Sequence, residues 1–217
     1  MPKLTIFDLD NTLLAGDSDR EWGKYLVESN IVPSTYLDES EKFYDNYHEG
    51  SLDIVSFLQF CLKPLKNNKM STLLELREDF INIKIKPIML ESAIKTIEYE
   101  KTHGPVIIAT ATNSFVTKPI AELFGIEDLI ATEFEIKDAK FTGDVLGMPC
   151  FREGKLEKVK NWSLKNKYDI SKATFYSDSF NDLPLLQGVG EAIVVDGDSK
   201  LIEEAKNNDW KTISFRS

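Results

Sequence analysis

The most informative part of the sequence lies near its start and reads Lys3-Leu4-Thr5-Ile6-Phe7-Asp8-Leu9-Asp10-Asn11-Thr12-Leu13-Leu14. Its apolar first half predicts a buried strand over residues 3–8. Side chains two apart in a strand point the same way, so Asp8 and Asp10 should leave the strand end toward one place. Two carboxylates aimed at one place repel each other unless a cation lies between them or one is protonated. This arrangement favours a chemical role, and the alternative is a plain Asp/Asn turn after a strand.

A second acidic strand end lies far along the chain, in Ala173-Thr174-Phe175-Tyr176-Ser177-Asp178-Ser179-Phe180-Asn181-Asp182. In an open α/β sheet, ligands bind outside the carboxyl ends of the strands. Two strands that end in aspartates at this edge would bring three or four carboxylates into one pocket. Such an oxygen-rich cluster suits a hard cation, and Mg²⁺ is therefore the expected cofactor.

Two further motifs lie between these strands. Residues 105–110 predict another buried strand, which leads into Thr110, Thr112 and Asn113, and Gly154-Lys155 opens a helical stretch. The order DxDxT, strand-end Thr, Gly-Lys and DSxND resembles the haloacid dehalogenase (HAD) superfamily of phosphatases. Residues 16–19, 131–133, 149–155 and 177–184 resemble its phosphoserine phosphatase branch (subfamily IB), and within it a bacterial subgroup linked to histidinol phosphate.

The resemblance implies a role for each motif residue. Asp8 is expected to be the nucleophile, since a carboxylate can attack phosphorus to form an aspartyl-phosphate. Asp10 is expected to act as general acid and base, and its presence favours phosphoryl transfer over dehalogenation. Thr110 and Lys155 would contact the phosphoryl oxygens. The remaining expectations are Asp8, Asp10 (through its backbone carbonyl) and Asp178 as metal ligands, Thr12, Asn181 and Asp182 as their supports, and Thr112 and Asn113 as substrate contacts.

Two of these residues have plainer interpretations. Thr12 is equally well explained as a hydroxyl that stabilises the turn. Asp182 is equally well explained as a carboxylate at a helix start, where the helix dipole favours negative charge.

The substrate prediction depends on Asp17, nine residues after Asp8, where phosphoserine enzymes carry an acidic residue that contacts the substrate ammonium. Asp19 and Glu21 make this region more acidic. Salt-bridged surface acids are the alternative. No guanidinium is clearly placed for a substrate carboxylate, although Arg20 and Arg77 are candidates. An amino-alcohol phosphate is therefore expected, histidinol phosphate first and phosphoserine second.

A non-catalytic phosphate-binding regulatory module on the same fold is the hypothesis of a different class. The intact motif set argues against it, because the loss of Asp8 or Asp10 would have been its signature.

Composition narrows the partners. The formal net charge of −10 disfavours nucleic acid, so a small phosphate ester is the expected partner of a monomer or homodimer. Two distant cysteines make a disulfide framework improbable and favour a cytoplasmic setting. Because residues 3–8 already predict a strand, we expect no signal peptide, and we expect no membrane span because no apolar run is long enough to cross a bilayer.

The pattern of elements predicts an α/β fold with a Rossmann-like, doubly wound, mainly parallel sheet. Residues 16–86 are helical in period and interrupt the strand–helix alternation, so they are expected to form an inserted helical cap whose aromatics mostly form the cap's own core. The core would then comprise residues 1–15 and 87–217. Its predicted elements include a helix over 88–103 and a hairpin of 129–136 and 139–145 that turns near Asp138.

Overall fold

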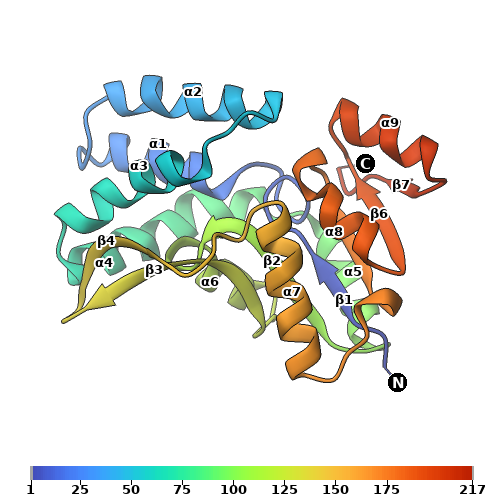
Figure 1. Ribbon diagram of the computed structural model, residues 1–217. Helices are drawn as coiled ribbons and strands as arrows, with labels where there is room; N and C mark the ends of the chain where they lie inside the picture. Colours follow the sequence, from blue (N-terminus) through green and yellow to red (C-terminus); the bar gives the residue numbers. More distant parts are fainter. Residues whose placement is uncertain (1, 217) are drawn as a thin grey trace.

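The computed structural model describes residues 2–216, and within them seven strands form one sheet in the order β4-β3-β2-β1-β5-β6-β7 (Figure 1). Neighbouring strands are parallel except β3 and β4, which form the predicted hairpin. This confirms the predicted α/β class with a mainly parallel sheet. The strands are β1 (Thr5–Phe7), β2 (Val106–Asn113), β3 (Leu129–Lys137), β4 (Lys140–Leu146), β5 (Thr174–Ser177), β6 (Glu191–Val195) and β7 (Lys211–Ile213).

Helices cover both faces of the sheet because successive strand residues point to opposite sides. Phe7 and Ile108 face α5 and α6, whereas Ile6 and Ile107 face α7, α8 and α9. The two faces therefore bury two separate apolar clusters. The helices are α5 (Glu91–Lys101), α6 (Ser114–Leu123), α7 (Glu153–Lys165), α8 (Leu183–Gly188) and α9 (Ser199–Asn207).

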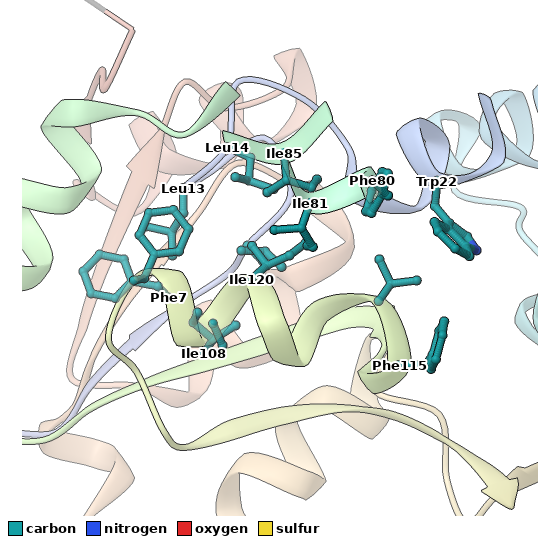
Figure 2. Packing of buried hydrophobic residues seen from close by; sticks show 14 of the residues in the cluster. Phe7, Leu13, Leu14, Trp22, Phe80, Ile81, Ile85, Ile108, Phe115 and Ile120 are labelled. Carbon is teal, nitrogen blue, oxygen red and sulfur yellow. The ribbon is translucent and has the colours of Figure 1, made fainter. Parts of the chain in front are cut away.

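Four helices follow β1 in the chain, and we call them the four-helix segment. Figure 1 shows α1, α2 and α3 gathered on one side of the sheet. Its aromatic side chains pack largely against one another, as expected, with the ring centroids of Phe43 and Phe57 5.4 Å apart, but this packing is continuous with the core on one face of the sheet. Trp22 packs against Phe80 and also against Phe115 of α6, with ring centroids 5.1 and 6.1 Å apart (Figure 2). The helices are α1 (Ser18–Glu28), α2 (Thr35–Glu49), α3 (Ile54–Asn67) and α4 (Met70–Phe80).

The chain returns to the sheet through a π-helical turn, Ile81–Ile85, and a 3₁₀ turn, Lys86–Ile88. The helix predicted from residue 88 begins only at Glu91. Met89 and Leu90 are extended instead, because Met89 forms an antiparallel bridge with Leu14 just after β1. The predicted hairpin turn is correct, since Asp138 and Ala139 both have positive φ angles, as a tight hairpin turn requires. No helix within residues 2–216 is long and apolar enough to cross a membrane.

Candidate active site

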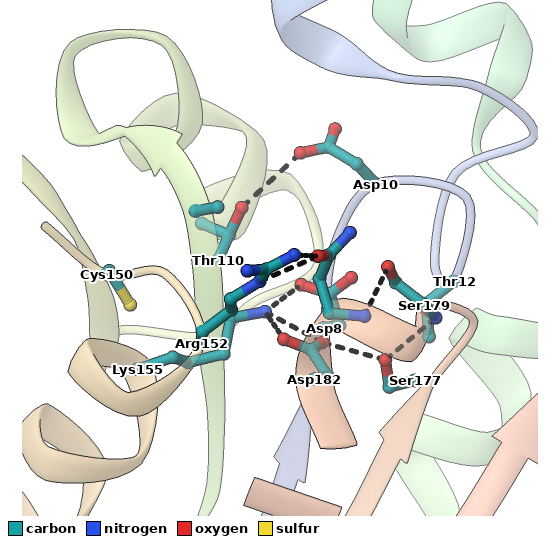
Figure 3. Close-up of polar contacts among 12 residues, drawn as sticks. Asp8, Asp10, Thr12, Thr110, Cys150, Arg152, Lys155, Ser177, Ser179 and Asp182 are labelled. Atoms are coloured by element: carbon teal, nitrogen blue, oxygen red, sulfur yellow. Dashed lines mark hydrogen bonds and ion pairs between the residues drawn. The ribbon is translucent and has the colours of Figure 1, made fainter. Parts of the chain in front are cut away.

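The carboxyl ends of β1 and β5 bring Asp8, Asp182 and the α7 residue Lys155 into direct contact (Figure 3). The Lys155 ammonium donates to Asp8 Oδ1 at 2.9 Å and to Asp182 Oδ2 at 2.8 Å. All three are buried, with exposed fractions of 6% for Asp8 and 3% for the other two. Ser177 Oγ donates to Asp182 at 2.7 Å and fixes its carboxylate from the other side. Asp182 therefore orients Lys155 toward Asp8.

Burial and the neighbouring charges shift the pKa values of the residues in this cluster. Burial raises the pKa of Asp8 to about 7, although the Lys155 ammonium opposes the shift. Burial alone would lower the pKa of Lys155, but the carboxylates of Asp182 and Asp8 outweigh it and raise that pKa well above the usual value. Lys155 therefore stays charged, and it is the cation nearest to where a phosphoryl group would meet Asp8.

Asp178 follows β5 and is the other carboxylate expected at a metal. Burial, together with the charges of Asp8 and Asp182, raises the pKa of Asp178 well above the usual value. Its Oδ1 accepts a hydrogen bond from Thr12 at 3.1 Å. Within residues 2–216, no three His, Cys, Asp or Glu side chains are grouped to hold a metal. The expected set is compatible with this result, because it uses two carboxylates and one backbone carbonyl.

Asp10 is held by donors from two directions. The backbone N–H of Ser18, at the start of α1, lies 2.6 Å from Asp10 Oδ1, and Thr112 Oγ1 lies 2.9 Å from Oδ2. Thr110 Oγ1 is further from Oδ2, at 3.4 Å. Burial and the nearby charge of Asp17 raise the pKa of Asp10 to about 6. Thr112, expected at the substrate, therefore holds Asp10 in this structure.

Asn113, predicted as a substrate contact, has a structural role at the start of α6. Its side chain is 3% exposed and does not line the cavity described below. Asn113 Oδ1 instead accepts the backbone N–H of Val116 at 3.2 Å and caps the start of α6. Asn113 therefore caps a helix in this structure, and its contact with substrate stays a prediction.

A cavity of about 270 Å³ extends from Asp8 to the four-helix segment. Its walls differ in chemistry. One wall is acidic and comes from the start of α1, and the other is apolar and aromatic and comes mainly from α2 and α3. The acidic wall consists of Asp17, Asp19 and Glu21, and the apolar wall of Phe43, Tyr44, Tyr47, Leu52, Ile54, Phe57 and Phe151.

The acidic wall carries charges that oppose one another. Burial and the neighbouring Asp19 raise the pKa of Asp17 to about 6, and burial and Asp10 likewise raise the pKa of Asp19 to about 6. Asp17 also caps α1, since its Oδ1 accepts the backbone N–H of Arg20 at 2.8 Å. Asp17 therefore both caps α1 and lines the cavity, and its contact with a substrate ammonium stays a prediction.

Several residues of the site were missed by sequence reasoning. Phe43, Tyr44 and Tyr47 were interpreted as core aromatics from their helical spacing, but they line the cavity. The Tyr47 hydroxyl lies 2.8 Å from Ser179 Oγ, and its pKa is raised well above the usual value by burial and by the charge of Asp178. Arg152, two residues before Gly154 in the stretch 149–155, was also given no role, although its positive charge in that stretch was visible in the sequence.

Comparisons with known proteins show the family to which the chain belongs. The family model for haloacid dehalogenase-like hydrolases matches residues 5–187. A histidinol-phosphatase of Neisseria meningitidis is 36% identical over the full length of both chains. A phosphoserine phosphatase of Mycobacterium tuberculosis is 27% identical over 97% of this chain and 70% of its own length.

Solved structures share the fold. A protein of unknown function from Bordetella pertussis has a TM-score of 0.90 and 32% identity, and the match covers 99% of this chain and all of that one. A substrate-bound phosphoserine phosphatase has a TM-score of 0.72 at 21% identity, over 98% of this chain and 93% of its own. The chain therefore belongs to the haloacid dehalogenase-like hydrolase family, as an enzyme of its phosphoserine phosphatase-like branch.

Proposed function

We propose that the protein is a Mg²⁺-dependent phosphomonoesterase that hydrolyses a small amino-alcohol phosphate through an aspartyl-phosphate on Asp8. One observation carries the proposal. The same cavity joins the buried group of Asp8, Lys155 and Asp182 to an acidic wall and an apolar wall. The first group suits the phosphate, and the two walls suit an amine attached to an apolar or aromatic body. Residues 16–86 would act as the cap that carries this selectivity.

The reaction would proceed in two displacements. In the first, an Asp8 carboxylate oxygen bonds to phosphorus while the ester P–O bond breaks, and Asp10 gives its proton to the leaving alkoxide. In the second, Asp10 takes a proton from water, whose oxygen bonds to phosphorus as the bond to Asp8 breaks. Inorganic phosphate and free Asp8 result. A pKa of about 6 suits Asp10 to both steps, because both of its protonation states are accessible near neutral pH.

Lys155 would neutralise negative charge on the phosphoryl oxygens, and Asp182 keeps its ammonium pointed at Asp8. Asp8, Asp178 and the backbone carbonyl of Asp10 would hold Mg²⁺. The donors fit this ion, since they are hard oxygens in a cluster whose carboxylates outnumber its single ammonium. When bound, the ion would supply further positive charge against the same oxygens.

The cavity favours a substrate without a carboxylate. The three lysine and arginine side chains that line it already have acidic partners, in the pairs Arg20–Glu41, Lys24–Glu21 and Lys155 with Asp8 and Asp182. Arg77, the other candidate, donates to the backbone carbonyl of Phe115 at 2.8 Å and does not line the cavity. Histidinol phosphate carries an amine and an aromatic ring but no carboxylate, so we place it before phosphoserine.

The test is a comparison of three esters with purified protein and Mg²⁺: histidinol phosphate, phosphoserine and p-nitrophenyl phosphate. We expect kcat/KM to be highest for histidinol phosphate, with Asp8→Asn as the inactive control. A higher value for phosphoserine would refute the order of substrates. Phosphate binding without turnover of any ester would instead support the non-catalytic module.

A further inference from the structure

The last turn of α2 is bound to the sheet domain through an unusual set of contacts. Four consecutive backbone carbonyls, those of residues 47–50, each accept a hydrogen bond from a side chain outside the four-helix segment. Asn181 Nδ2 reaches the carbonyl of Tyr47 at 3.2 Å, and Arg152 Nη2 reaches that of Gly50 at 2.7 Å. Lys200 Nζ reaches the carbonyls of His48 and Glu49 at 2.9 and 3.2 Å. The carbonyl end of a helix is its negative pole, so two of these three donors are cations where cations bind best.

We call these hydrogen bonds to the carbonyls of residues 47–50 the α2 lock, and Arg152 connects it to the catalytic cluster. Its Nε and Nη2 donate to Asn181 Oδ1 at 3.0 and 2.8 Å, and the same guanidinium reaches Gly50. Arg152 is also the residue before α7 begins, three positions from Lys155, and it lies beside Lys155 and Asp8 in Figure 3. One side chain therefore joins the start of α7, the DSxND motif and the end of α2.

The backbone of Arg152 adds a second, independent observation. Its φ and ψ are 49° and −119°, in a turn closed by the N–H of Gly154 on the carbonyl of Phe151. Glycine is the residue that normally occupies this conformation, and a side chain there is strained. Strain of this kind persists where the surroundings require the side chain, and the contacts of this guanidinium are what would be lost with glycine.

We propose that Arg152 is a positioning residue that, with Asn181 and Lys200, locks the end of α2 over the active site and so fixes the wall of the cavity on which substrate selection depends. α2 contributes Phe43, Tyr44 and Tyr47 to that wall. The catalytic carboxylates follow strands β1 and β5 and are not part of α2. Loss of the lock should therefore weaken substrate binding more than it slows the chemical step.

The decisive variant is Arg152→Gly, which removes the guanidinium and at the same time suits the backbone angles. Lys167→Gly is the matched control, since Lys167 is also a cation at positive φ, 63°, just beyond the other end of α7 and away from the cavity. Arg152→Lys keeps a cation, so its hydrogen exchange and KM should lie between those of the wild type and those of Arg152→Gly. Lys200→Met removes two contacts from an exposed side chain, and it covers the case in which Arg152→Gly fails to fold.

Two measurements separate the outcomes. Hydrogen exchange of a peptide over residues 43–52 in the free protein should become at least about tenfold faster in Arg152→Gly, less so in Lys200→Met, and stay unchanged in Lys167→Gly. KM for the best ester should rise about tenfold or more in Arg152→Gly with kcat within about threefold. Unchanged exchange would overturn the lock. A loss confined to kcat would also overturn it, because Arg152 would then act through Lys155.

The kinetic measurement rests on the proposed function, but the exchange measurement does not. A wild-type protein that turns over no ester would refute the phosphatase proposal and leave the lock to be decided by exchange alone.

Discussion

Replacing Asp17 with Asn should make the protein more stable and its selectivity poorer, and the two effects can be measured on one variant. Asp17 lies in the acidic wall, where burial and Asp19 raise its pKa from 3.8 to about 6. Its charged form is therefore less favourable in the folded than in the unfolded protein. Asn keeps an oxygen that can cap α1 through the N–H of Arg20, so the helix start is retained.

The sign of the pH dependence follows from this shift. The folded protein holds the Asp17 proton between about pH 4 and pH 6 while the unfolded chain has released it, so the wild-type free energy of unfolding falls as pH rises through that window. A shift of about 2 pKa units corresponds to about 3 kcal/mol at most. Because Asp17 is partly exposed, we expect about 1–2 kcal/mol after solvent screening. Asp17→Asn should gain this amount above pH 6 and nothing below pH 4.

The assay is urea unfolding of wild type and variant in EDTA at several pH values from 4 to 8. If the variant and the wild type differ in free energy of unfolding by the same amount at pH 4 and at pH 8, the raised pKa of Asp17 is refuted. On the same variant, kcat/KM for histidinol phosphate should fall tenfold to a hundredfold, since a charge-assisted hydrogen bond of about 1.5–3 kcal/mol is lost. p-Nitrophenyl phosphate has no amine and should be nearly unaffected. Equal losses on both esters would mean that Asp17 supports the catalytic cluster and not the amine.

Three further outcomes are expected. Asp8→Asn should fold normally and lose several orders of magnitude in turnover, and retention of more than about a tenth of wild-type turnover, little more than 1 kcal/mol of barrier, would exclude Asp8 as nucleophile. EDTA should abolish turnover, Mg²⁺ should restore it and Ca²⁺ should inhibit it, and full activity in chelator would contradict the proposed dependence on Mg²⁺. The apparent affinity for Mg²⁺, measured by calorimetry, should weaken as pH falls through about 7, because buried Asp8 takes up a proton there. Gly154→Ala should lower the free energy of unfolding by about 1–3 kcal/mol, because a Cβ at this position would lie 2.2 Å from the carbonyl oxygen of Pro149. It should also reduce turnover, because the next residue is Lys155. An unchanged urea midpoint would contradict this prediction, because it would show that the backbone moves to make room for the Cβ.

The parts of the site that lie at strand ends were predictable from the sequence. Asp8, Thr110 and Asp178 each follow an apolar run, and parallel strands bring their carboxyl ends to one edge. The resemblance of the Gly-Lys motif singled out Lys155 as a residue of the site, and in the structure its ammonium contacts Asp8. The position of each residue after its strand was enough to predict that these side chains share one edge, because the parallel sheet places the strand ends side by side.

Contacts that join the four-helix segment to the sheet were not predictable in the same way. Helical spacing indicates that Tyr47 lies on an apolar face, but not whether that face meets a core or a cavity. Asn113 shows the same limit for a polar residue, since its position at a strand end did not reveal that its side chain caps α6. Arg152 gave a positive charge in a recognised motif, but its partner carbonyl at Gly50 is 102 residues away. Such pairings depend on tertiary placement, which no local pattern records.

The residues that we propose for substrate selection and for acid catalysis, Asp17 and Asp10, are connected through the first turn of α1. Asp17 caps this helix, and the next residue, Ser18, gives its backbone N–H to Asp10. After burial, the charge of Asp17 is the largest cause of the raised pKa of Asp10. A substrate ammonium bound at Asp17 would offset that charge and lower the pKa of Asp10. An amine-bearing ester would therefore set the acidity of the group that protonates its own leaving oxygen, whereas an ester without an amine would leave Asp10 as it is in the free protein. Under this proposal the acidic wall lowers the stability of the folded protein, but it places the residue that would bind the amine next to Ser18, whose N–H contacts the proposed general acid Asp10.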